Sequence, residues 1–217
     1  RFDLTPDGPT INEGRRLADR FHFIPESQVR QQWIKLFLKG VNFEKAFNIL
    51  LTINHAQFFP GLIELNSTRQ DSRHHPEGNV LRHTAQTLTA MAKICDLRGI
   101  HGDERLIRMA AMLVHDLGKI DATITNDDGT ISSIGHAEIA EPRARLLLNS
   151  IAFPKSLQEK VISLAIHHMK PHFEMGKSAI RRLSVELDQA TIDQLADVAI
   201  ADKSGRVADG NVQIVYC

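Results

Sequence analysis

The chain has 217 residues, with 26 basic and 26 acidic side chains, eleven histidines and two cysteines. Its length allows one large domain or two small ones with a true hydrophobic core. The balanced charge excludes a global basic field of the kind that binds nucleic acid non-specifically, although a local basic patch stays open.

Neither a membrane protein nor a disulfide-stabilised secreted protein is expected. No apolar run reaches the roughly 20 residues of a membrane span, and residue 1 is Arg in a polar stretch rather than in a signal peptide. Cys95 lies in an apolar helical run and Cys217 is the last residue, so both are expected to be reduced thiols. These features predict a cytoplasmic protein.

The first third of the chain is expected to be a small helical bundle. Residues 1–10 combine Pro, Gly and Asp and predict a loop. Gly40 is assigned the left-handed conformation that often ends a helix. Apolar residues at helical spacing predict helices over 11–23, 25–39, 42–53 and about 59–65. Their apolar stripes are assigned to the core rather than to a cofactor site.

A polar stretch at 66–78 is the expected boundary between a helical body (1–70) and a second domain (71–217). Strong periodicity then predicts two helices, over 79–98 and over 103–118. Asp103 is the expected N-cap of the second helix.

One short β-hairpin is expected between 121 and 134. Its β-branched residues flank Asp128–Gly129, a pair typical of a type I′ turn. Further helices are predicted over 136–150, 155–169, 177–187 and 190–202. The predicted fold class is therefore all-α with one short hairpin.

Histidine and aspartate side chains recur at the ends of predicted helices. His83 is followed by the doublet His115–Asp116, and imidazoles with a carboxylate favour zinc, manganese, iron or nickel. Asp202 is the downstream carboxylate that would complete a hydrolytic centre with four protein ligands. Chance rarely places so many such residues at helix ends, so we predict a bound divalent metal ion.

Further histidines allow a second ion. His136 and the doublet His167–His168 would bind it, with Asp116 as the shared carboxylate. In the alternative, a single ion is bound and these imidazoles bind phosphate or orient water. Lys119 is expected to contact a phosphate, against the simpler interpretation of a solvated charge at a helix end. The number of ions, and the choice among Mn, Ni, Fe, Mg and Zn, stay open.

These residues resemble a known family. HDLGK at 115–119, within the order H…HD…H…HH…D, is similar to the HD superfamily of metal-dependent phosphohydrolases. HPEGNVLRHT at 75–84, GHAE at 135–138 and ADKSGR at 201–206 look like the carboxy-terminal, HD-containing part of bacterial tRNA nucleotidyltransferases, the CCA-adding enzymes. The chain lacks the Gly-Ser turn and paired aspartates of a nucleotidyltransferase head. It is therefore expected to be the tail of such an enzyme or a free-standing relative, unable to add CCA alone.

Three functions follow as hypotheses. The resemblance implies a phosphohydrolase, with Asp116 and Lys119 catalytic, that acts on a nucleotide or RNA-end phosphoester such as a 2′-nucleotide or a 2′,3′-cyclic phosphate. The second hypothesis is a tRNA-binding body, and the third is hydrolysis of signalling nucleotides. Candidate RNA contacts are Arg15, Arg16, Arg181 and Arg182, for which a solvated face is at least as plausible. The oligomeric state is not predicted.

Overall fold

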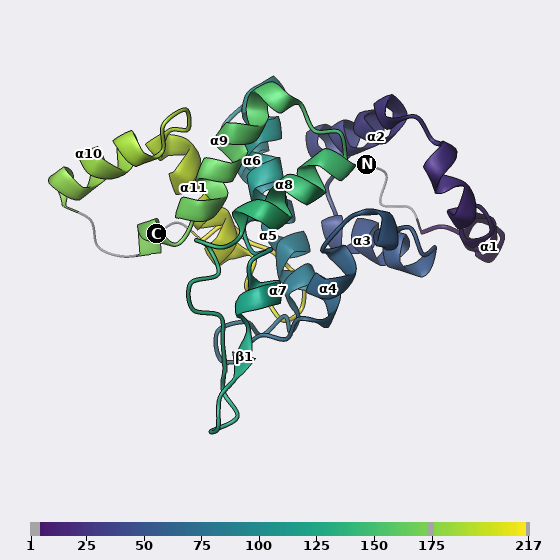
Figure 1. The fold of residues 1–217 in the computed structure, drawn as a ribbon, viewed down its shortest axis with the longest axis horizontal. Helices are drawn as coiled ribbons and strands as arrows, with labels where there is room; N and C mark the ends of the chain where they lie inside the picture. The colour runs from purple at the N-terminus through teal and green to yellow at the C-terminus, as the bar shows by residue number, and fades with distance from the viewer. Residues whose placement is uncertain (1–4, 173–175, 216–217) are drawn as a thin grey trace.

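The computed structural model describes residues 5–172 and 176–215 of the chain. Over these residues the protein is almost entirely helical, and its one sheet is a two-stranded hairpin (Figure 1). The predicted all-α class with a short hairpin is therefore confirmed. Among the described residues, no helix is long and apolar enough to span a bilayer.

The N-terminal helices lie on one side of the molecule (Figure 1). In chain order they are α1 (Gly8–Arg16), η1 (Ala18–Phe23), α2 (Glu26–Lys39), α3 (Phe43–Thr52), η2 (Ala56–Phe58) and α4 (Leu62–Ser67). The prediction of a loop over residues 1–10 was wrong in part. Helix α1 begins at Gly8, because the side chain of Asp7 accepts a hydrogen bond from Thr10 N at 2.9 Å and caps the helix.

Gly40 ends α2 in an extended conformation, with φ −69° and ψ 142°, rather than in the predicted left-handed one. The reason for glycine is close packing instead. A Cβ atom at Gly40 would lie 2.5 Å from the carbonyl oxygen of Leu36 and 2.8 Å from the ring of Phe43. Only glycine lets the chain turn this tightly from α2 into α3.

Helix α5 (Val80–Leu97) lies at the centre of the fold and packs against α3, α4, α6 (Gly102–Val114) and α11 (Ile192–Ser204). It begins at Asn79, whose side chain accepts a hydrogen bond from Arg82 N at 2.8 Å. The N-cap of α6 is His101, so the prediction of Asp103 as the cap was wrong. Asp103 instead lies in the first turn, where a carboxylate complements the helix dipole.

A short helix and the hairpin follow α6. They are α7 (Lys119–Ala122), β1 (Ile124–Thr125) and β2 (Ile131–Ser132), and the two strands pair antiparallel. Gly129 has φ 79° and donates its N–H to Asn126 O at 2.9 Å, whereas Asp128 does not have a positive φ. A type I′ turn needs positive φ at both central residues, so this prediction was wrong; the turn is the longer kind that ends in a glycine bulge.

The remaining helices are α8 (Glu141–Ser150), α9 (Lys155–His167), η3 (Lys170–His172) and α10 (Lys177–Glu186). Helix α8 starts at Glu141 rather than at 136 as predicted, because Pro142 is favoured in the first turn of a helix. His136 therefore lies in the turn before α8. In Figure 1, α10 and α1 lie at opposite ends of the molecule.

The hydrophobic core is continuous from α2 to α11. It includes Phe37 of α2, Met109 of α6 and Val198 of α11. The predicted boundary near residue 70 stays a prediction, and this core extends across it. Cys95 is buried and free within the core, as predicted for a reduced thiol, whereas Cys217 lies outside the described residues.

A buried charge fastens α11 to α6. Asp197 is fully buried, and one of its carboxylate oxygens accepts a hydrogen bond from Arg108 Nε at 2.8 Å. Arg98 pairs with the other oxygen. Because a buried carboxylate without its partners is costly, this pair constrains how α11 lies on α6.

Arg108→Met is therefore expected to destabilise the fold by about 3 kcal/mol, since the buried Asp197 would keep only Arg98. The control is Arg145→Met, which removes partly exposed pairs with Glu141 and Glu159 and is expected to cost less than about 1 kcal/mol. Urea unfolding followed by circular dichroism, with chelator present, measures both. Equal losses in the two variants would contradict the prediction.

Candidate metal centre

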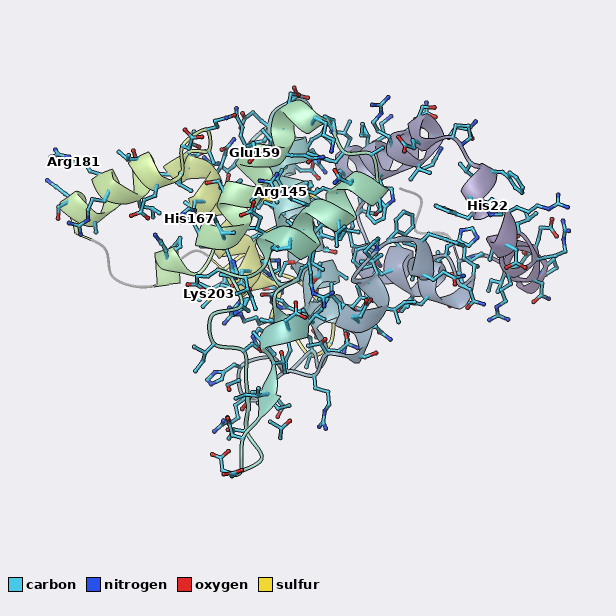
Figure 2. All side chains as sticks on the ribbon, in the orientation of Figure 1. His22, Arg145, Glu159, His167, Arg181 and Lys203 are labelled. Carbon is cyan, nitrogen blue, oxygen red and sulfur yellow. The ribbon has the colours of Figure 1, made fainter. Side chains whose placement is uncertain are left out.

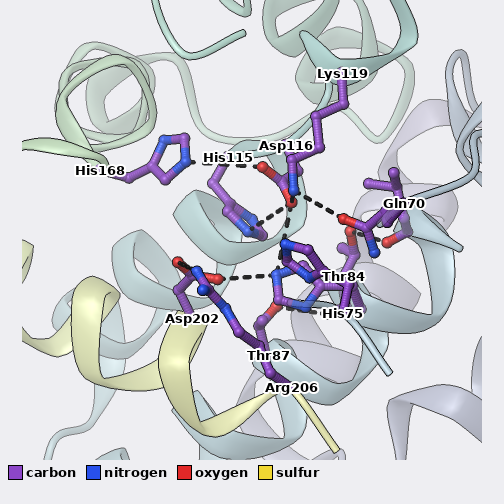
Figure 3. Close-up of polar contacts among 12 residues, drawn as sticks. Gln70, His75, Thr84, Thr87, His115, Asp116, Lys119, His168, Asp202 and Arg206 are labelled. Atoms are coloured by element: carbon purple, nitrogen blue, oxygen red, sulfur yellow. Dashed lines mark hydrogen bonds and ion pairs between the residues drawn. The ribbon is translucent and has the colours of Figure 1, made fainter. Parts of the chain in front are cut away.

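Four histidine side chains lie around the carboxylate of Asp116, although they come from distant parts of the chain. Their nearest ring nitrogens lie between 3.1 and 3.7 Å from the carboxylate oxygens. The four are His83, His115, His136 and His168, and none of them is more than 7% exposed. Figure 3 shows His115, His168 and Lys119 around the carboxylate of Asp116.

Helix ends deliver these side chains. His115 is the C-cap of α6, His168 is the C-cap of α9, and Asp202 lies in the last turn of α11. The C-terminal end of a helix carries a partial negative charge from its free carbonyls. Three such ends next to two carboxylates make this a strongly cation-attracting part of the core.

Two glycines allow the segments to approach closely enough. A Cβ atom on Gly118 would lie 1.9 Å from His136 O, so only glycine lets the turn after Asp116 touch the turn that carries His136. A Cβ atom on Gly205 would lie 2.7 Å from Thr87 N, which brings the end of α11 against the backbone of α5. Both contacts lie next to cluster residues and set their spacing.

The hydrogen bonds of the imidazoles identify their tautomers. Nδ1 of His115, His136 and His168 lies 2.9, 2.8 and 2.6 Å from the carbonyl oxygens of Met112, Ser133 and Ala165 respectively. A carbonyl oxygen can only accept, so each Nδ1 carries a proton. In the neutral ring, Nε2 then holds a lone pair that faces Asp116.

These lone pairs need a positive charge between them. Nε2 of His136 lies 3.2 Å from Nε2 of His168 and 3.1 Å from Asp116 Oδ1, and Nε2 of His115 is buried without a hydrogen-bond partner among the described residues. Acceptors that face one another repel unless a proton or a cation lies between them. The donor set of imidazole nitrogens and carboxylate oxygens fits a divalent transition metal or zinc.

Burial disfavours protonation of these imidazoles as the source of the positive charge. Burial lowers the pKa of His115 to about 4 and that of His168 to about 3, because a buried imidazolium loses its hydration. Burial alone would raise the pKa of Asp116, but His115, Lys119 and His136 hold it well below its usual value. Around neutral pH these groups are neutral imidazoles and a carboxylate, the forms that bind metals.

His83 is held differently. Its Nε2 lies 2.9 Å from Asp202 Oδ1 and its Nδ1 lies 2.7 Å from Glu77 Oε1. Burial opposes a charge on His83, but these two carboxylates raise its pKa. A cation at this position would take the place of the proton on Nε2.

Lys119 and Arg206 add positive charge beside the carboxylates. Nζ of Lys119 lies 2.8 Å from Asp116 Oδ2 and donates to Gln70 Oε1 at 2.8 Å. Arg206 Nη2 donates to Asp202 Oδ2 at 2.7 Å. A cavity of about 500 Å³ opens onto Asp116, Lys119, Asp202 and Arg206, so both cations can reach a ligand there.

The possible ligand atoms of the described residues fall into overlapping sets, each with its atoms within 4.8 Å of one another. His83, His115 and Asp116 form one set, and Asp116, His136 and His168 form another. A third set, of His75, Glu77 and His83, does not include Asp116. This geometry suits either one ion with extra imidazoles or two ions with a shared carboxylate. The number of ions stays a prediction.

His167 is the candidate ligand that the structure does not bring to this cluster. Its Nδ1 donates to Ser163 O at 2.8 Å, and its Nε2 lies 3.9 Å from Glu186 Oε2. Neighbouring residues on a helix point about 100° apart, so only one histidine of the doublet can face inward.

Sequence analysis did not identify three polar residues at the centre: Glu77, Gln70 and Arg206. Glu77 and Arg206 lie within HPEGNVLRHT and ADKSGR, the segments that carried the resemblance. Their role depends on contacts across turns, which spacing alone does not show. Gln70 lies in the polar stretch 66–78, which was predicted to be a domain boundary, and its sequence neighbours do not indicate a site residue.

Comparisons with known proteins agree with this site. A family model described as HD domain matches residues 80–206, more than half of the chain. The multifunctional CCA protein of Halorhodospira halophila (strain DSM 244 / SL1) is 26% identical over 157 residues, which cover 70% of this chain and 35% of that protein. The chain thus spans about a third of the length of this curated relative. No solved structure matches the chain.

The histidine doublet offers a matched test of the centre. His168→Ala is expected to weaken the binding of manganese or zinc by at least about 10-fold, because an inward-facing ligand is lost. His167→Ala, one residue away, is expected to leave the affinity unchanged. Calorimetric titration of chelator-treated protein, with metal analysis of untreated protein, measures both. Similar losses in the two variants, or none in either, would refute the site.

Proposed function

The chain belongs to the HD domain family, and from this we propose that it is a metal-dependent phosphohydrolase of nucleotide or RNA-end phosphoesters, such as 2′,3′-cyclic phosphates and 2′-nucleotides. The HD domain points to a metal-dependent hydrolase in general. The substrate is the finer part of the proposal. It draws on the likeness to the multifunctional CCA protein, which covers 70% of this chain.

One observation supports the proposal most directly. The cluster of buried imidazoles and carboxylates faces the same cavity as an ammonium and a guanidinium, those of Lys119 and Arg206. Asp116, at 2% exposed, is the common neighbour of the imidazoles and of Lys119. A cation site beside fixed positive side chains suits a phosphoester, whose charge grows during hydrolysis.

The residues that would hold the cation are His83, His115, Asp116 and Asp202, with His136 and His168 beside Asp116. When bound, a divalent cation polarises a phosphoryl oxygen and lowers the pKa of water, so that a nucleophile forms near neutral pH. The buried helix ends and carbonyl hydrogen bonds keep the ligands in place before substrate arrives. This preorganisation reduces the reorganisation needed during the reaction.

Lys119 is proposed to act on the phosphate. Asp116 and Gln70 hold its Nζ, each at 2.8 Å, so that its position is fixed even though its side chain is long. The ammonium can stabilise the negative charge of the phosphoryl group by a charge-assisted hydrogen bond. Its side chain needs only a small movement, since Lys119 already lines the cavity.

The cavity also has an apolar side that suits a nucleoside. Ile131 and Ile134 of the hairpin segment and Met169 after α9 line it together with the charged residues. Ile134 is 90% exposed, so a nucleobase that packed against it would remove apolar surface from water. This arrangement supports a nucleotide over inorganic pyrophosphate or a bare phosphate.

Asp116→Asn is expected to abolish metal-stimulated hydrolysis of 2′,3′-cyclic AMP and of 2′-AMP, because it removes the shared carboxylate. Lys119→Met is expected to retain metal but to lower kcat/KM by about 10- to 100-fold, the loss of one hydrogen bond to a charged group. Both rates are measured with manganese, nickel, iron and magnesium. His167→Ala is the control and should keep full activity; unchanged rates in Asp116→Asn would end the proposal.

The same assays test the alternative hypothesis that the substrate is a signalling nucleotide. Cyclic dinucleotides and guanosine polyphosphates are included beside the RNA-end phosphoesters. Faster metal-dependent hydrolysis of the signalling nucleotides would replace the proposed substrate class while leaving the metal centre in place.

The second candidate function is binding of tRNA, and the relation to a CCA protein supports it. The arginine pairs lie far apart, with Arg181 on α10 at the end of the molecule opposite α1 (Figure 2). Arg16 already pairs with Glu13 at 2.6 Å, and Arg15 donates to Thr52 O at 2.7 Å. Arg181 and Arg182 are exposed and are the stronger candidates for phosphate contact.

Replacing Arg181 and Arg182 together by Gln is expected to weaken tRNA binding and to reduce the slope of log affinity against log salt by about one unit per lost phosphate contact. Gel shifts over a salt series measure this. Replacing Arg15 and Arg16 is the comparison at the other end of the molecule. Absence of any shift with the unaltered protein at low salt would reject RNA binding.

A further inference from the structure

A buried carboxylate links two histidines beside the Asp116 cluster. Oε1 of Glu77 lies 2.7 Å from Nδ1 of His83 and 2.8 Å from Nδ1 of His75. Glu77 is 3% exposed and forms, with His75 and His83, a set of possible metal ligands that does not include Asp116. One oxygen therefore contacts two imidazoles, as a hydrogen-bond acceptor for His75 and as a close ionic partner for His83, whose Nδ1 has no hydrogen-bond partner among the described residues.

The contact with His83 differs from those of the other three imidazoles. Their Nδ1 atoms are held by backbone carbonyls of the preceding turn, whereas His83 is held by the carboxylate of a separate loop. A carboxylate on the outer nitrogen of a ligating histidine fixes the ring orientation and makes the inner nitrogen a stronger donor to metal. At His83 this inner nitrogen is Nε2, which faces Asp116 and Asp202.

His75 is the other partner of Glu77, and it lines the cavity. Its Nδ1 donates to the carboxylate of Glu77, so Nε2 of the neutral ring carries a lone pair and can only accept a hydrogen bond. The ring of His75 packs edge-on against the ring of His83, with centroids 4.8 Å apart. Gln70 and Lys119 line the same cavity as His75.

The loop that carries Glu77 is well fixed. The backbones of Arg69 and Asn79 form an isolated bridge, and Gln70 N donates to Gly78 O at 3.2 Å. His75 N donates to Asp71 O at 2.8 Å. Oε2 of Glu77 is buried without a hydrogen-bond partner among the described residues, which is a cost to stability rather than a gain. A purely structural role does not explain such a side chain.

We propose that Glu77 is a positioning residue for the metal centre: through Nδ1 of His83 it holds Nε2 of that ring toward Asp116 and Asp202. His75, which shares the same carboxylate oxygen, is not a ligand of the metal. This inference rests on the proposed phosphohydrolase function. It assigns Glu77 a role in metal affinity without making it a ligand.

Manganese is the probe, so that the test does not depend on turnover. Each variant of the full chain is titrated with manganese by calorimetry. Glu77→Gln is expected to weaken manganese by about 10- to 100-fold without changing the stoichiometry. His75→Ala is expected to keep both the manganese affinity and the stoichiometry.

The matched control is Glu64→Gln, which alters an exposed carboxylate on α4 and should not change the manganese affinity. Melting temperatures in chelator are measured for all variants, so that a loss of stability is separated from a loss of metal affinity.

Three results would overturn the proposal. Unchanged manganese affinity in Glu77→Gln would show that the carboxylate does not position His83. A loss of manganese in His75→Ala as large as in Glu77→Gln would make His75 a ligand, and a melting temperature of Glu77→Gln low enough to account for its loss of manganese affinity would make the role structural. Failure of the proposed function is distinct, since then the unaltered protein itself would bind no manganese.

Discussion

The fold depends on the charge balance around one buried carboxylate. The oxygens of Asp116 face imidazole nitrogens that carry lone pairs, because the opposite nitrogen of each ring donates to a backbone carbonyl. Acceptors at these distances repel unless positive charge lies among them. Lys119 supplies part of that charge at 2.8 Å, and a divalent cation would supply the rest. Without such charge, burying this set of groups would be unfavourable.

The surrounding helices serve this cluster in two ways. Their C-terminal ends bring partial negative charge, which favours a cation but further disfavours bare acceptors. Their packing fixes the spacing, through the glycine contacts at Gly118 and Gly205 and through the buried pair of Arg108 and Asp197 that holds α11 on α6. Stability and site geometry are therefore coupled, since a shift of α11 would move Asp202 away from His83.

Helix periodicity and the order of His and Asp residues were enough to predict the all-α fold and most members of the cluster. The failures have local physical causes. His167 could not be separated from His168 until the helical rotation of α9 was known, and Gly40 serves close packing rather than a left-handed turn. Glu77 was missed because its contacts with His83 and His75 depend on how the loop before α5 folds. Sequence spacing does not show which nitrogen of a ring a carboxylate contacts.

The contact between His83 and Asp202 joins residues 119 positions apart in the chain. During synthesis, His83, His115 and Asp116 therefore leave the ribosome well before the carboxylate that accompanies them in the folded protein. A cation captured by the nascent chain would at first have an incomplete set of ligands and would exchange readily with the cellular pool. Selection of a metal would then be completed only when α11 docks, so that the finished fold, rather than the order of translation, would decide which ion stays.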